Sequence, residues 1–163
     1  MTGDAQGALD DFQFALRVNS AYIPAMQNAS YILSERLQRP KEAIAMLSRI
    51  IDKSPASAAA YSGRAILHAR AGDRQKALAD VQQAERMTTD TLIHYQIACV
   101  YAQTSRVEKS DELLANAWLA KSFSANPQLI AEAKKDPDLD PIRKNPGFEA
   151  LLKRPIDNRK QTP

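Results

Sequence analysis

One pattern of small and large residues recurs along this chain at intervals of 35, 34 and 33 residues. Each copy has a small residue, a larger apolar residue four positions later and a third residue after seven. The clearest copy consists of Ala77, Val81 and Ala84. The four copies begin at Ala8, Ala43, Ala77 and Ser110. Because spacings of four and seven place residues on one helix face, the pattern predicts a series of helices that pack on their neighbours.

A second pattern precedes the later copies, in which a small or polar residue is followed after three positions by an aromatic residue or histidine. Examples are Asn28 with Tyr31, and Ala98 with Tyr101. A short turn at 71–74 separates the two patterns, so each copy is a helical hairpin. Only five glycines occur in 163 residues, which argues against an all-β chain. We expect helices near 3–18, 21–37, 41–53, 57–71, 74–87, 91–104 and 107–122.

The period, the turn residues Gly72 and Asp73, the small residues Ala77 and Ala84, and Pro55 after a second helix resemble the tetratricopeptide repeat. The resemblance covers about residues 3–124, with Asn28 and His68 as departures. It implies an all-α, right-handed superhelical solenoid of antiparallel helix pairs, with about three and a half repeats. We expect a repeat array at 1–124, divided into a half repeat at 3–20 and repeats at 21–57, 58–90 and 91–124.

The tail has a different composition. Four Asn-Pro or Asp-Pro pairs, which begin at Asn126, Asp136, Asp140 and Asn145, predict short helices that each start at a capping residue. Residues 125–155 are therefore expected to form short capping helices that close the array. This segment resembles the one that ends repeat arrays in many bacterial proteins of the family, some of them attached to serine/threonine protein kinases. The polar residues 156–163 are expected to be disordered.

Patterns that carry chemistry are scarce. The sequence has no glycine-rich phosphate loop and no zinc or nucleophile motif. Asp136, Asp138 and Asp140 alternate as in a calcium loop, but Pro141 and Gly147 stand where such a loop needs glycine and glutamate, so helix capping is the favoured interpretation. Cys99 is the only cysteine and is expected to pack as a small apolar residue. We therefore expect no enzyme, no cofactor and no metal site.

In the tetratricopeptide family the first helices of successive repeats line a concave groove. The resemblance thus implies a non-catalytic scaffold that binds a peptide or partner segment, and only Arg70 offers a cation there. The alternative for these residues is an ordinary surface, and the alternative function is a regulatory or docking domain of a larger signalling enzyme such as a bacterial Ser/Thr protein kinase. The expected groove residues are Tyr22, Met26, Ala29, Leu33, Ser62, Ile66, Arg70, Leu92, Tyr95, Gln96, Cys99 and Gln103.

Residues 3–18 match a second helix whose first-helix partner is missing. We expect either that the chain is a piece of a longer protein, with the missing helix upstream, or that a second copy covers this face in a homodimer. The net charge of +3 is small, so we expect no nucleic-acid partner. Without a long apolar run or a signal peptide, we expect no membrane insertion and a cytoplasmic location.

Overall fold

A computed structural model describes residues 4–153, and the expected disordered tail at 156–163 lies outside the described residues. All regular structure in this range is helical. The elements are α1 (Ala5–Val18), α2 (Ile23–Tyr31), the π-helical turn η1 (Ile32–Arg36), α3 (Pro40–Lys53), α4 (Ala58–Arg70), α5 (Arg74–Met87), α6 (Thr91–Thr104), α7 (Asp111–Ala125), α8 (Leu129–Ala133), the 3₁₀-helix η2 (Pro137–Ile142) and α9 (Pro146–Leu152).

With η1 taken as the continuation of α2, the seven long helices begin and end within four residues of the expected ranges. Asp4, Ser57, Asp73 and Asp90 each accept a hydrogen bond from a backbone N–H of the first turn, as expected of capping residues. The largest difference is at α7, which begins at Asp111 because Glu108 binds the backbone N–H and hydroxyl of Ser110 and prolongs the turn before the helix.

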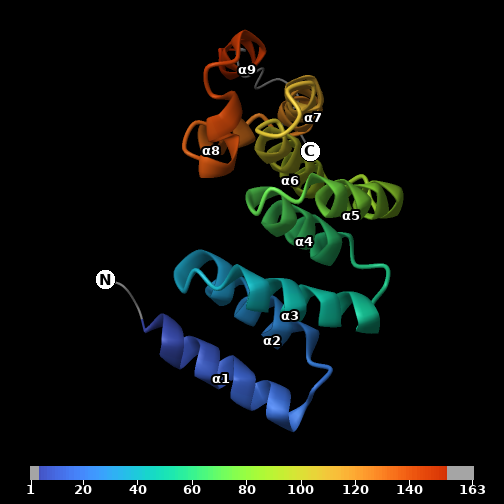
Figure 1. Cartoon of the computed structure of the whole chain (residues 1–163), viewed down its shortest axis with the longest axis vertical. Coiled ribbons are helices and arrows are strands. Elements are labelled where there is room, and N and C mark those ends of the chain that lie inside the picture. The colour runs from blue at the N-terminus through green and yellow to red at the C-terminus, as the bar shows by residue number, and fades with distance from the viewer. Residues whose placement is uncertain (1–3, 154–163) are drawn as a thin grey trace, which may run out of the picture.

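Helices α1 to α7 form a rising stack, and the short helices α8 and α9 lie beside its far end (Figure 1). From α1 to α7 each helix contacts the next along the chain, and α4 also packs on α6, so that successive pairs share a core. The repeated small residues lie in this core: Ala77, Val81 and Ala84 are at most 1% exposed. Partly buried side chains such as Ile66 and Tyr61 contact more than one core cluster, which makes the core continuous.

The tail after α7 packs on α6 and α7 rather than extending the stack. Leu139, Ile142 and Phe148 are fully buried there. Asp136 and Asn145 cap η2 and α9 as expected. The expectation that Asp140 starts a helix of its own is wrong, because Pro141 continues η2, which already began at Pro137.

Candidate functional site

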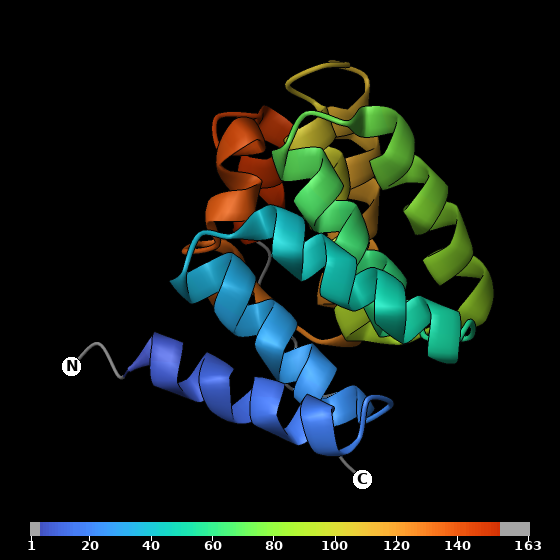
Figure 2. The ribbon, with the colours of Figure 1, turned by 60° about the horizontal axis from the view of Figure 1, so that its bottom comes forward.

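A cavity of about 650 Å³ lies on one side of the array, between α2, η1, α4, α6 and residues 136–138. Figure 2 shows the tail that contains residues 136–138, in orange to red, beside the green helix α4 on one side of the stack. We call this cavity the groove. Its lining consists of Gln27, Ser30, Tyr31, Ser34, Glu35, Leu47, Ala59, Ala60, Gly63, Ile66, Leu67, Arg70, Leu92, Tyr95, Gln96, Cys99, Asp136, Pro137 and Asp138.

Local sequence explains why this side is hollow. On α4, the small residues Ala59, Ala60 and Gly63 face the groove and leave Leu47 to form part of its floor. On the opposite wall, α2 ends in a π-helical turn in which the Leu37 N–H donates to the Ile32 carbonyl at 3.0 Å. Such wide turns re-aim side chains and are frequent at functional sites.

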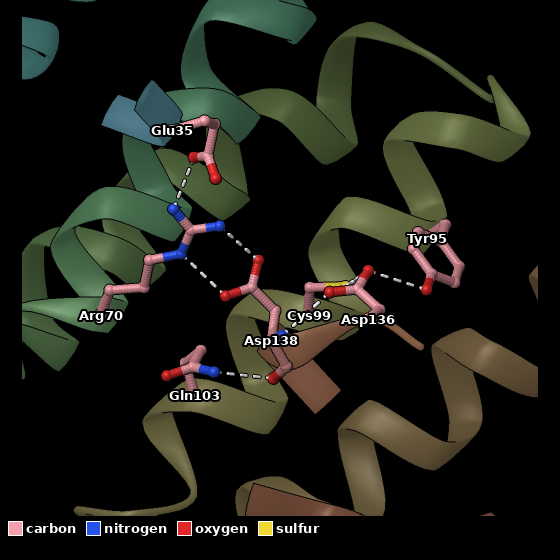
Figure 3. A network of polar contacts seen from close by, with 7 residues as sticks. All are labelled: Glu35, Arg70, Tyr95, Cys99, Gln103, Asp136 and Asp138. Atoms are coloured by element: carbon pink, nitrogen blue, oxygen red, sulfur yellow. Dashed lines mark hydrogen bonds and ion pairs between the residues drawn. The ribbon is translucent and has the colours of Figure 1, made fainter. Parts of the chain in front are cut away.

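Arg70 makes the central polar contact of the groove (Figure 3). Its Nε and Nη2 donate to the two carboxylate oxygens of Asp138 at 2.7 and 2.8 Å, and Nη1 donates to Glu35 at 2.7 Å. The hydrogen bonds to Asp138 raise the pKa of Arg70 above its ordinary value despite partial burial. The guanidinium is thus charged and already engaged by two carboxylates of the chain itself.

Asp136 forms a second contact between the tail and α6. Its Oδ2 accepts from the Tyr95 hydroxyl at 2.9 Å and from the Cys99 thiol at 3.6 Å, and its Oδ1 accepts from the Asp138 N–H at 2.9 Å. Nearby, Gln103 Nε2 donates to the Asp138 carbonyl at 2.8 Å. Tyr95, Cys99 and Gln103 therefore form a stripe along α6 that holds the tail (Figure 3).

The surroundings of the Cys99 thiol disfavour its reactive thiolate form. Burial, followed by the nearby Asp136 carboxylate, raises the pKa of Cys99 well above its ordinary value. Burial also raises the pKa of the Tyr95 hydroxyl. Because a nucleophilic cysteine needs a lowered pKa, Cys99 has the opposite of the environment that activates a thiol. No cluster of three potential metal ligands occurs within residues 4–153.

Six of the twelve predicted site residues line the groove, namely Ile66, Arg70, Leu92, Tyr95, Gln96 and Cys99. Two others are buried and join elements: Ser62 donates to Gln96 at 2.6 Å between α4 and α6, and Gln103 binds the tail. Tyr22 is exposed just before α2, outside the groove lining.

The expected positions of Met26, Ala29 and Leu33 in the groove are wrong. All three are at most 2% exposed and lie in the core cluster that includes α1 and α3. The apolar stripe of α2 packs in this core, so the neighbouring helix face, which carries Gln27 and Tyr31, lines the groove instead. The helical spacing of the apolar residues in this stripe already indicated in the sequence which face of α2 is buried.

The groove residues that sequence reasoning missed include Tyr31 at the end of α2, Glu35 in η1, and Asp136 and Asp138 in the tail. The aspartates were recognised only as capping residues, and Asp136 does cap η2. No local pattern relates Asp138 to Arg70, since 68 residues separate them.

No helix within residues 4–153 is long and apolar enough to cross a membrane. No protein family model and no curated protein matches the sequence. Two solved structures of MamA, a helical tetratricopeptide-like solenoid, are similar to this chain. One is 19% identical with a TM-score of 0.63 and covers 93% of this chain and 79% of its own; the other is 20% identical with a TM-score of 0.64 and covers 92% and 88%. This likeness confirms that the chain is an all-α, tetratricopeptide-like solenoid of helix pairs.

Proposed function

We propose that this chain is a non-catalytic protein-interaction module that binds a peptide or partner segment in the groove. One observation carries the proposal. The same surface already holds the chain's own residues 136–138, through a two-point contact from Arg70, a hydroxyl donor from Tyr95 and an amide donor from Gln103 to a main-chain carbonyl. These are the kinds of contact by which proteins hold a bound segment.

The part of the groove that residues 136–138 do not occupy offers a similar mixture of apolar and hydrogen-bonding groups. Tyr31 and Leu92 are 58% and 56% exposed, and Gln27 and Gln96 supply exposed amides beside them. Exposed apolar side chains that line a cavity with polar neighbours are typical of binding surfaces.

The finer identity is also part of the proposal. We infer that residues 1–124 are a tetratricopeptide array of the bacterial type and that 125–155 form its closing segment, in a cytoplasmic protein. Attachment to a larger signalling enzyme and self-association through residues 3–18 stay predictions.

A displayed library of random 12-residue peptides, selected against the whole chain, tests the function. Ala59 is an exposed alanine in the groove lining, so Ala59→Trp fills the groove without disturbing the core. Ala79 is an exposed alanine on α5 outside the lining, which makes Ala79→Trp the matched control. Selected peptides should bind the wild type and Ala79→Trp but not Ala59→Trp. A selection that yields no binders, or binders indifferent to Ala59→Trp, would overturn the proposal.

A further inference from the structure

The charges that line the groove are mostly negative, although the whole chain carries a net charge of +3. Among the lining residues, the three carboxylates of Glu35, Asp136 and Asp138 accompany a single cation, Arg70. The negative character is therefore local to this surface, and it depends on two residues that the tail contributes.

The single cation is fully engaged. Arg70 binds both oxygens of Asp138, which is only 9% exposed, and one oxygen of Glu35. Asp136 differs, because the hydrogen bonds to its carboxylate come from uncharged groups, and no lysine, arginine or histidine within residues 4–153 lies within 4 Å of that carboxylate. Arg143 donates to the main-chain carbonyl of Asp136 at 2.8 Å rather than to its side chain. Within the described residues, the groove thus presents a carboxylate that has no salt-bridge partner, and its one lining cation is already engaged.

The tail is packed firmly into the core and forms a fixed wall of the groove. Leu139 and Ile142 follow Asp138 directly and are both 0% exposed. Releasing the tail would return both apolar side chains to water, which is unfavourable. A partner therefore meets Asp136 and Asp138 in place and binds alongside them.

Apolar surface adjoins this carboxylate. Ile66 on α4, Leu92 on α6 and Tyr31 on α2 line the same cavity as Asp136. Ser62 donates to the Gln96 side-chain oxygen at 2.6 Å, which leaves the Gln96 amide nitrogen as a donor for a main-chain carbonyl.

We propose that the groove recognises a segment of another protein in which a lysine or arginine stands next to an apolar residue. This inference rests on the proposed function and names the partner's chemistry. The cation pairs with Asp136, and the apolar side chain packs against Ile66 and Leu92. Charge complementarity of this kind selects among partners, because a like charge placed there meets an uncompensated carboxylate.

A peptide array of three matched sets of 12-residue sequences provides the test. Members of a matched triplet are identical except that the residue before a central leucine is lysine, glutamine or glutamate. The wild-type chain should favour lysine over glutamine by about tenfold in Kd and bind the glutamate set most weakly, where tenfold corresponds to about 1.4 kcal/mol. Raising the salt concentration should narrow the preference for lysine.

Two matched variants test whether the Asp136 carboxylate causes the preference for lysine. Asp136→Asn retains a capping side chain and removes the charge, and it should abolish the preference for lysine. Asp140→Asn makes the same charge change in an exposed residue outside the lining and should leave the preference intact. Equal binding of the lysine and glutamine sets, or a preference for glutamate, would overturn this inference and leave the proposed function standing. Binding of none of the sets would overturn both. If Asp136→Asn fails to fold, the salt dependence of the wild-type chain is the test: a preference for lysine that added salt does not narrow would overturn the inference.

Discussion

At the scale of single residues, three arginines join separate elements through two-point contacts with one carboxylate each. Arg64 binds Asp80 across α4 and α5, Arg74 binds Asp111 across α5 and α7, and Arg70 binds Asp138 in the tail. The three carboxylate residues are all buried, at 9% exposure or less. Because a planar guanidinium fits a carboxylate in one orientation, these pairs fix the relative positions of the elements.

The variant Arg70→Gln would leave the buried Asp138 carboxylate without its cation. We expect the free energy of unfolding, measured by urea denaturation, to fall by about 1–3 kcal/mol. Arg39→Gln is the control, since Arg39 and Glu42 form an exposed pair within one helix turn, and the loss of stability expected there is much smaller. Equal losses in the two variants would contradict this prediction.

The stability should also depend on pH through His94, which is 5% exposed with its ring centroid 4.9 Å from that of Trp118. Burial, followed by the charge of Lys121, lowers the pKa of His94. Its folded pKa is thus below the unfolded value of about 6.5, so its contribution to stability is present above that pH and lost as the pH falls through the folded pKa.

His94→Gln should therefore reduce the loss of stability in urea melts between about pH 7.5 and about pH 5. Part of the loss should persist, because burial also lowers the pKa of His68. Identical pH profiles for the wild type and His94→Gln would rule out this role.

At the scale of elements, α4 ends in a turn that requires glycine. The Asp73 N–H donates to the His68 carbonyl and the Gly72 N–H to the Ala69 carbonyl, which is the Schellman arrangement. Gly72 has a φ of +80°, a conformation that side chains with a Cβ rarely adopt. In contrast, Gly63 lies inside α4, where an added Cβ would be 3.6 Å from Leu47, an ordinary contact.

The same substitution should therefore have opposite effects at the two sites. Gly72→Ala should lower the free energy of unfolding by about 1–2 kcal/mol through backbone strain. Gly63→Ala should raise it by about 0.5–1 kcal/mol, since alanine favours helix interiors over glycine. Chemical denaturation of both variants measures the difference, and effects of the same sign would disprove the argument.

At the scale of the whole molecule, the tail is part of the core. Leu139 is 0% exposed in a cluster with α6 and α7, so Leu139→Ala should cost about 2–5 kcal/mol of unfolding free energy. Leu113 is 73% exposed on α7, and Leu113→Ala should change stability by no more than about 0.5 kcal/mol. If Leu139→Ala were as mild as Leu113→Ala, the tail would be too loosely held to form a wall of the groove.

Self-association through α1 is a second prediction at this scale. Leu9 and Leu16 are covered by neighbouring helices, which leaves Phe14 and Val18, 59% and 76% exposed and four positions apart, as the apolar surface of α1. Sedimentation velocity at micromolar concentration should detect self-association that Phe14→Glu removes and Leu113→Glu does not. A monomeric wild type would contradict the prediction.

Local chemistry determined most of the helical array from the sequence alone. Small residues at fixed spacing identify helix faces, so Ala77 and Ala84 could be placed in the core without a structure, and both are 0% exposed. Caps such as Asp73 and Asn145 act on N–H groups two or three residues away, which makes them visible in sequence.

Only the tertiary structure decided which side chains form the groove. Whether Met26 or Gln27 faces the groove depends on how α2 packs with α1 and α3, and the apolar stripe that contains Met26 is buried there. The contact of Arg70 with Asp138 joins residues 68 positions apart, and it exists because burial of Leu139 and Ile142 places the tail against α6. The acidic character of the groove follows from that packing, since no spacing along the chain encodes it.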